Sequence, residues 1–169
     1  EGFLLLTKEQ VRFVHDKVRE ATYSLIGEEE RIRYHYKIGR LLLENTTLEL
    51  LEDRIFDILE QLNLGKSLIH SYEEQLELIG LNLKAGKKAK SSTAYQPAFN
   101  FLKQGAEILL ENKWEMHYEL CLEIYKELAE CEYLLTHFSE ADKLFAYILE
   151  NAKTPLDKIS VIHIQLRQK

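Results

Sequence analysis

The sequence of 169 residues has few of the residues that interrupt regular secondary structure. It contains only seven glycines and two prolines, so little of the chain is marked as turn. Leu, Glu and Lys are the commonest residues instead, as is typical of mostly helical proteins. We therefore predict an all-α fold with at most one β-hairpin.

The sequence also lacks an excess of positive charge and a long apolar run. Its 22 basic and 28 acidic residues give a net charge of −6, which excludes a global basic field for a polyanion. The apolar run Phe3–Leu6 is far shorter than the roughly 20 residues that cross a bilayer. We therefore expect no nucleic-acid partner, no membrane span and no targeting segment.

Cysteine is scarce. Cys121 and Cys131 lie in one expected helix, about 15 Å apart along its axis, which is too far for a disulfide. We expect two reduced, buried thiols in a cytoplasmic protein. The chain begins at Glu1 and its only methionine is Met116, so we interpret it as a piece of a longer protein.

No motif of a self-contained active site is present. The six histidines never stand beside another His or Cys at the spacing of zinc ligands. The sequence also lacks a glycine-rich phosphate loop, a Gly-x-Ser-x-Gly elbow and a His-Glu-x-x-His helix. We therefore predict no enzymatic activity, no metal and no cofactor for this chain.

Apolar periodicity predicts a hairpin at Phe3–Val14 followed by eight helices. Glycines at positions 27 and 65 are expected helix ends. One long helix is expected from Trp114 to Thr136, because its apolar spacing continues without a break. The expected helix starts are Ser71, Pro97, Ser139 and Thr154-Pro155.

Two helix pairs share a pattern of small and large residues that resembles tetratricopeptide repeats. Equivalent alanines, Ala98 and Ala141, are 43 residues apart, whereas that family repeats every 34 residues or so. The pattern therefore predicts a degenerate array of antiparallel helix pairs, an α-α superhelix. The two matching sets are Gly86, Ala89, Ala98 and Leu102, and Ala129, Phe138, Ala141 and Phe145.

Two groups of side chains are candidates for partner binding. Lys84, Lys87 and Lys88 share one helical face, which is either solvated or faces an acidic partner. Tyr118 and Tyr125 either line a peptide groove or pack in the core, and an aromatic stripe at helical spacing is more often part of a core.

The segment RFVHDKVREATYSL, followed by Arg31 and His35, resembles the winged-helix end of the ATPase module in bacterial STAND-type regulators of the AAA+ superfamily. The likeness continues through HYKIGRLLLENT, RIFDILEQLNLG, LNLKAGKKAKSSTAY and LDKISV. These stretches resemble the region that follows the ATPase in large bacterial multidomain kinases. Such kinases carry a serine/threonine-kinase domain in front and sensor and histidine-kinase domains behind.

The resemblance implies that residues 1–45 are the winged-helix end of the ATPase module and that residues 46–169 are tetratricopeptide-like repeats. It implies a nucleotide-sensing role for His15 in the longer protein, beside the alternative that His15 packs or caps the start of a helix. The function that the resemblance implies is a non-catalytic linker and protein-interaction region of a multidomain bacterial signal-transduction ATPase-kinase. It would bind a protein or another domain of its own polypeptide and couple partner or sensor input to ATPase and kinase output. A self-sufficient, peptide-binding helical adaptor is the alternative.

Overall fold

The computed structural model describes residues 4–6, 11–13, 16–109 and 113–167. Within them, a short hairpin is followed by helices that pack in pairs, so the expected all-α array is confirmed. The elements are β1 (Leu4–Leu6), β2 (Val11–Phe13), α1 (Asp16–Ser24), α2 (Glu28–Glu44), α3 (Leu48–Leu64), a 3-10 turn (Lys66–Leu68), α4 (Tyr72–Ser91), α5 (Tyr95–Ile108), α6 (Lys113–Met116), α7 (Tyr118–Leu134), α8 (Phe138–Asn151) and α9 (Pro155–Arg167).

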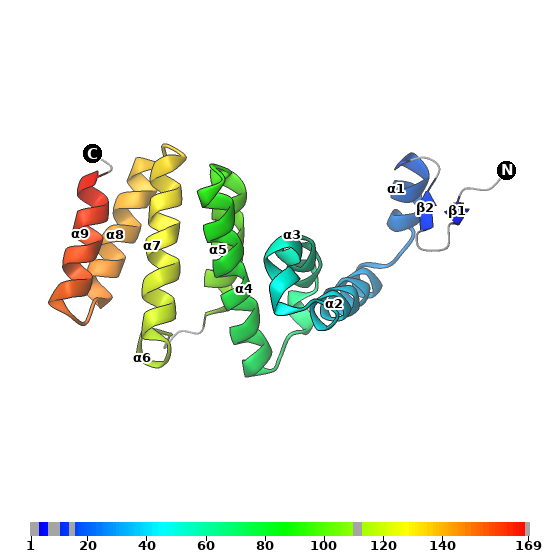
Figure 1. Ribbon diagram of the computed structural model, residues 1–169, viewed down its shortest axis with the longest axis horizontal. Coiled ribbons are helices and arrows are strands. Elements are labelled where there is room, and N and C mark those ends of the chain that lie inside the picture. Colours follow the sequence, from blue (N-terminus) through cyan, green and yellow to red (C-terminus); the bar gives the residue numbers. More distant parts are fainter. Residues whose placement is uncertain (1–3, 7–10, 14–15, 110–112, 168–169) are drawn as a thin grey trace.

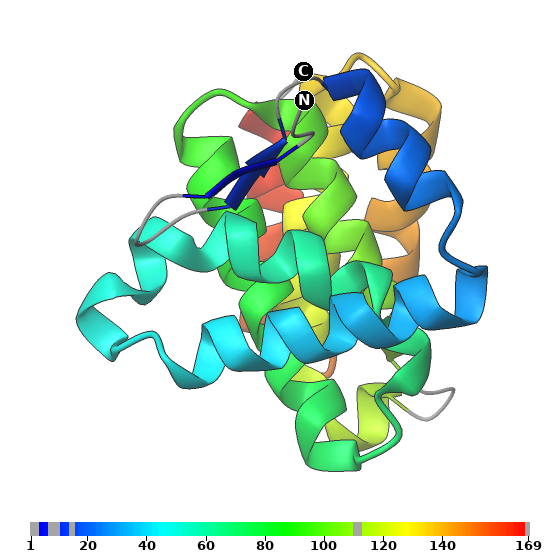
Figure 2. The same ribbon diagram turned by 90° about the vertical axis from the view of Figure 1, so that its right-hand side faces the viewer.

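The helices follow one another along the long axis of the molecule, with the two termini at opposite ends (Figure 1). The antiparallel strands β1 and β2 form the expected hairpin, with Leu4 opposite Phe13. Three pairs follow, namely α2 with α3, α4 with α5, and α7 with α8. Figure 2 shows the first pair, in light blue and cyan, lying across the other helices. The array therefore changes direction between α3 and α4.

The core runs through α4 from one neighbouring pair to the next. Leu78, Leu81 and Ala85 pack with α3, whereas Ile79 and Leu83 pack with α5 and α7. A third cluster joins α6, α7, α8 and α9. Since α4 is apolar on more than one side, it is a buried helix between two layers. The pairs thus form one continuous scaffold.

Small residues let helices approach closely where the repeat pattern predicts it. Gly86 is buried against Leu102 of α5, and a Cβ atom at Gly86 would lie 2.5 Å from Leu102 Cγ. Ala98 and Ala141 are also buried. Gly80, on the same helix, differs, because a Cβ atom at this position would have no other atom within 4 Å. Gly80 is therefore not a contact point between helices.

Several helix ends agree with the sequence. Gly65 ends α3, and the Ser71 hydroxyl accepts a hydrogen bond from the Glu74 backbone N–H at 3.3 Å. Thr154 Oγ1 accepts one from the Asp157 backbone N–H at 3.1 Å, and Pro155 is the first residue of α9. The side chains of Ser71 and Thr154 thus satisfy amides that a helix start leaves unbonded.

Three other predicted ends were wrong. The helix expected from Trp114 to Thr136 breaks at His117, because Trp114 turns inward and its indole N–H donates to the Tyr147 hydroxyl at 2.9 Å. The next helix, α8, begins at Phe138, so Ser139 lies inside it. Helix α5 begins at Tyr95, two residues before Pro97, which fits the first turn of a helix.

Candidate protein-interaction groove

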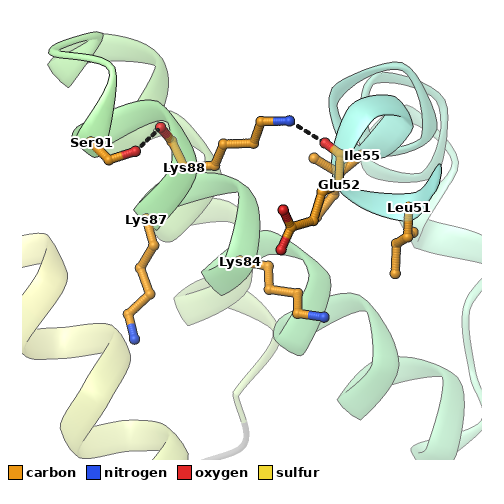
Figure 3. Close-up of a pocket in the computed structure, with 7 residues that line it drawn as sticks. All are labelled: Leu51, Glu52, Ile55, Lys84, Lys87, Lys88 and Ser91. Atoms are coloured by element: carbon orange, nitrogen blue, oxygen red, sulfur yellow. Dashed lines mark hydrogen bonds between the residues drawn. The ribbon is translucent and has the colours of Figure 1, made fainter. Parts of the chain in front are cut away.

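A cavity of about 430 Å³ opens between α3 and α4, at the point where the array changes direction. Leu51 and Ile55 of α3 supply apolar walls, and the lysines of α4 stand at its rim (Figure 3). The lining residues are Leu51, Glu52, Ile55, Lys84, Lys87, Lys88 and Ser91. We call this cavity the α3/α4 groove.

The three predicted lysines come together in this groove, but their ammonium groups differ. Lys88 donates to the backbone carbonyl of Glu52 on α3, and Lys87 forms an ion pair with Glu123 on α7. Figure 3 shows Lys84 and Lys88 extending toward α3 and Lys87 extending away from it. Among the described residues, Lys84 has no ion-pair partner, and its side chain is exposed.

The groove is locally basic on an acidic protein. Three lysines line it against one carboxylate, that of Glu52, whereas the whole chain carries a net charge of −6. Basic residues also suit the last turns of α4, because the carbonyl end of a helix favours cations. An apolar wall beside an available ammonium group can hold a segment that combines apolar and acidic side chains.

A second cavity of about 250 Å³ continues the apolar surface toward the end of α4 and the start of α5. Phe56 joins the two sites, since the Lys88 ammonium lies 5.4 Å from the centre of its ring. Phe56 also stacks on Phe101, with the ring centres 5.4 Å apart. The lining residues are Phe56, Ala89, Ser92, Ala94, Pro97 and Phe101.

Polar contacts also hold α3 and α4 together. The amides of Asn63 and Asn82 exchange two hydrogen bonds, at 2.9 and 3.0 Å, and Asn82 is fully buried. Sequence reasoning missed this pair. Its signal is that both asparagines stand between two leucines, as Leu-Asn-Leu, which puts a polar residue in an apolar surrounding.

Salt bridges add to this junction between the first two pairs. Arg40 of α2 bonds to Glu77 of α4 at 2.7 Å and lies 3.9 Å from Glu74. Tyr36 donates its hydroxyl to Glu74 at 3.1 Å. Burial and this carboxylate raise the pKa of Tyr36. The first pair is thus fixed to the second through directional contacts from both α2 and α3.

The two predicted tyrosines lie elsewhere. The Tyr118 hydroxyl donates to Asp157 at 2.7 Å and accepts from the Lys153 backbone N–H at 2.9 Å. Tyr125 stacks on Trp114, with ring centres 5.7 Å apart. Both rings pack against the cluster of α6, α7, α8 and α9, and neither lines the α3/α4 groove.

His15 lies outside the described residues, so its nucleotide-sensing role stays a prediction. His35, named with the same resemblance, bridges Gln61 of α3 and Tyr23 of α1 through its two ring nitrogens, at 2.7 Å each. Cys121 and Cys131 are buried thiols in α7, as expected. Burial raises the pKa of the Cys131 thiol to about 12.

No cluster of three potential metal ligands occurs within residues 16–109 and 113–167 or the two strands. None of the described helices is long and apolar enough to cross a membrane. Neither finding assigns a chemical activity to the groove.

A comparison with curated proteins finds Hybrid signal transduction histidine kinase G of Dictyostelium discoideum. It is 32% identical over 167 aligned residues, which cover 83% of this chain but only 5% of the relative. No protein-family model matches the chain, and no solved structure matches it. The chain is therefore similar to a small region of a signal-transduction kinase.

Proposed function

We propose that this chain is a non-catalytic interaction region of a multidomain signalling protein. In this proposal the α3/α4 groove binds a segment of a protein partner, or of another domain of the same polypeptide, and this binding alters kinase output. The similarity to a region of a signal-transduction histidine kinase supports the assignment to a signalling protein. The observation that carries the proposal is the groove itself, with apolar walls and an exposed ammonium group at Lys84.

The occupant that fits the groove is a peptide segment with apolar side chains flanked by carboxylates. Leu51 and the methylene groups of the lysine side chains at the rim would contact its apolar residues, and Lys84 would face its acidic ones. Such a segment shifts a kinase between two states only by its different affinity for them. A groove between two helix pairs suits this task, because a change in their angle alters its width.

The finer assignment follows the sequence resemblance. We propose that residues 1–45 belong to the winged-helix end of a STAND-type ATPase module, that residues 46–169 are tetratricopeptide-like repeats, and that the protein works in the cytoplasm. The relative comes from Dictyostelium discoideum, so a bacterial source is not carried into the proposal. A self-sufficient peptide-binding adaptor remains the second candidate, and the same groove would serve it.

Charge reversal in the groove tests the proposal. In the full-length protein, Lys84→Glu with Lys88→Glu should change the autophosphorylation rate by about fivefold or more, since coupling between sites commonly has that size. The matched control is Lys103→Glu with Lys143→Glu, which reverses two exposed lysines on α5 and α8. Equal autophosphorylation in both double variants and the parent would reject the proposed coupling.

The proposal that this chain is not an enzyme is tested separately. Calorimetry of this chain with MgATP should show no binding heat at micromolar to millimolar nucleotide, because the sequence has no phosphate-binding loop. ATP hydrolysis by the purified chain would contradict the proposal.

A further inference from the structure

The second cavity lies where α3, α4 and α5 meet, and we call it the α4/α5 pocket. Its volume of about 250 Å³ is below the roughly 300–1,000 Å³ of small-molecule sites, so it has room for one side chain. Phe56 of α3 and Pro97 and Phe101 of α5 supply apolar walls. The polar side chain in the lining is that of Ser92, whose hydroxyl donates to the Lys88 carbonyl at 3.2 Å. The pocket therefore suits an apolar group.

The turn beside this pocket occurs a second time in the array. Thr93, between α4 and α5, and Thr136, between α7 and α8, have left-handed φ angles of 60° and 65°. They are separated by the same 43 residues as Ala98 and Ala141. In each turn the residue after the threonine donates its backbone N–H to the carbonyl five residues earlier, at 3.0 and 2.9 Å, which closes the helix end in the same way. The two turns can thus be compared position by position.

This comparison shows that small side chains leave the α4/α5 pocket open. At the second turn, the ring of His137 donates from Nδ1 to the Glu132 carboxylate at 2.7 Å. The equivalent positions of the first turn carry Ala94 and Ala89, which both line the pocket. Since the second turn accommodates the larger pair, the turn itself does not require alanines. The space that they leave is available to a side chain from outside.

Positive charge beside the pocket indicates which kind of segment supplies that side chain. Lys88 stands between the pocket and the α3/α4 groove, because its ammonium lies 5.4 Å from the centre of the Phe56 ring and donates to the Glu52 carbonyl. Within the part of the chain that the structure describes, neither Lys84 nor Lys88 forms an ion pair with a carboxylate. Two such cations beside an apolar pocket complement a segment in which a carboxylate lies close to an apolar residue.

The walls of the pocket favour an aromatic side chain. The rings of Phe56 and Phe101 are stacked with their centres 5.4 Å apart, and a further ring can pack against them in an offset or edge-on arrangement. Aromatic side chains also bring a large contact area with few rotatable bonds. For this reason they are frequent anchors in interface pockets.

Resting on the function proposed above, we propose that the α4/α5 pocket binds one aromatic side chain of the segment that occupies the α3/α4 groove. The segment crosses Lys88, with its carboxylates at Lys84 and Lys88 and its aromatic residue between Phe56 and Pro97. The groove thus supplies attraction for acidic apolar segments, and the pocket selects among them.

Peptide selection provides the probe for this test. A phage-displayed library of short random peptides is selected on this chain and counter-selected on its variant with Lys84→Glu and Lys88→Glu, so that enriched peptides require the cations of the groove. They should contain an aromatic residue close to Asp or Glu. Absence of enrichment would overturn both the groove and the pocket. Enriched peptides without an aromatic residue would overturn the pocket alone.

A double-mutant cycle then tests the contact itself by fluorescence polarisation. One enriched peptide is compared with its derivative in which alanine replaces the aromatic residue. Ser92→Leu fills the pocket from an exposed position, and Gln96→Leu, exposed in the first turn of α5 but outside the lining, is the matched control. Ala94→Leu fills the pocket from the other side of the turn and is a second test variant.

Both test variants should weaken binding of the aromatic peptide by at least about tenfold, as loss of an interface anchor does, and should leave binding of the alanine peptide unchanged. The control should bind both peptides as the parent chain does. Thermal melting by circular dichroism verifies that each variant is folded. Equal affinity of the parent chain and the folded Ser92→Leu variant for the aromatic peptide would overturn the pocket, whereas the counter-selection would still support the groove.

Discussion

The α4/α5 interface and the α3/α4 junction share one helix but are built in different ways. Against α5, helix α4 presents Gly86 and Ala89, and Leu102 fills the space that the missing side chain leaves. Against α3, it joins a buried Asn63–Asn82 pair to an apolar patch beside an open groove. One side of α4 is thus closely packed, whereas the other leaves room for a ligand.

We therefore expect the two sides of α4 to have different roles. Close apolar packing is dense and leaves few alternative arrangements, so α4 and α5 form a rigid unit. At the α3/α4 junction, hydrogen bonds and ion pairs fix the relative orientation of the helices but leave part of the space between them unfilled. We expect substitutions in the first interface to affect stability and those in the groove to affect binding.

The largest effect is expected at Leu102. Leu102→Ala removes a fully buried side chain from the α4/α5 interface and should lower the free energy of unfolding by about 2–5 kcal/mol. Urea denaturation followed by circular dichroism measures this change. A loss below about 0.5 kcal/mol, the range of surface substitutions, would show that the interface is not closely packed.

A smaller loss is expected from Gly86→Leu. The new side chain would collide with Leu102, and overpacking of this kind typically costs about 1–3 kcal/mol. Thermal melting provides the measurement.

Gly80 on the same helix offers a matched control. Gly80→Ala should stabilise the chain by roughly 0.5–1 kcal/mol through helix propensity, because its Cβ meets no neighbour. Gly86→Ala should instead destabilise it. The same sign for both alanines would contradict the assigned helix contact.

The asparagine pair should give the next effect. Asn82→Ala removes both hydrogen bonds to Asn63 and should lower the free energy of unfolding by about 1–2 kcal/mol, near the usual cost of losing a buried partner. The double variant with Asn63→Ala should cost less than the sum of the two single losses. Additive losses in this double-mutant cycle would show that the amides do not interact.

The smallest stability effect is expected in the groove. Lys84→Glu changes an exposed side chain without an ion-pair partner among the described residues, so the free energy of unfolding should change by no more than about 0.5 kcal/mol. Chemical denaturation checks this value. A larger loss would mean that Lys84 stabilises the α3/α4 junction and is not free to meet a partner.

The sequence predicted those helix ends that are set by a single capping residue and its near neighbours. Gly65, Ser71 and Thr154 act within one helical turn, so a short window of sequence contains the whole cause. The contact at Gly86 was also predictable, because small residues recur at the repeat spacing.

Contacts between distant residues were not predictable in this way. The break at His117 depends on Trp114 reaching Tyr147, 33 residues away, and no glycine or proline marks it. Spacing placed the three lysines on one face, but their different environments depend on α3 and α7. The groove lies where the first pair crosses the following helices, and no local pattern encodes that crossing.

Hydrogen–deuterium exchange tests most directly whether the open side of α4 is the binding side. Exchange is compared between this chain alone and the full-length protein, peptide by peptide. The account predicts slower exchange in the full-length protein for α3 and for the Lys84–Ser91 part of α4, and equal exchange for α8, which lines no part of the groove and packs against α7 and α9. Equal exchange at α3 and α4 in both proteins would contradict it.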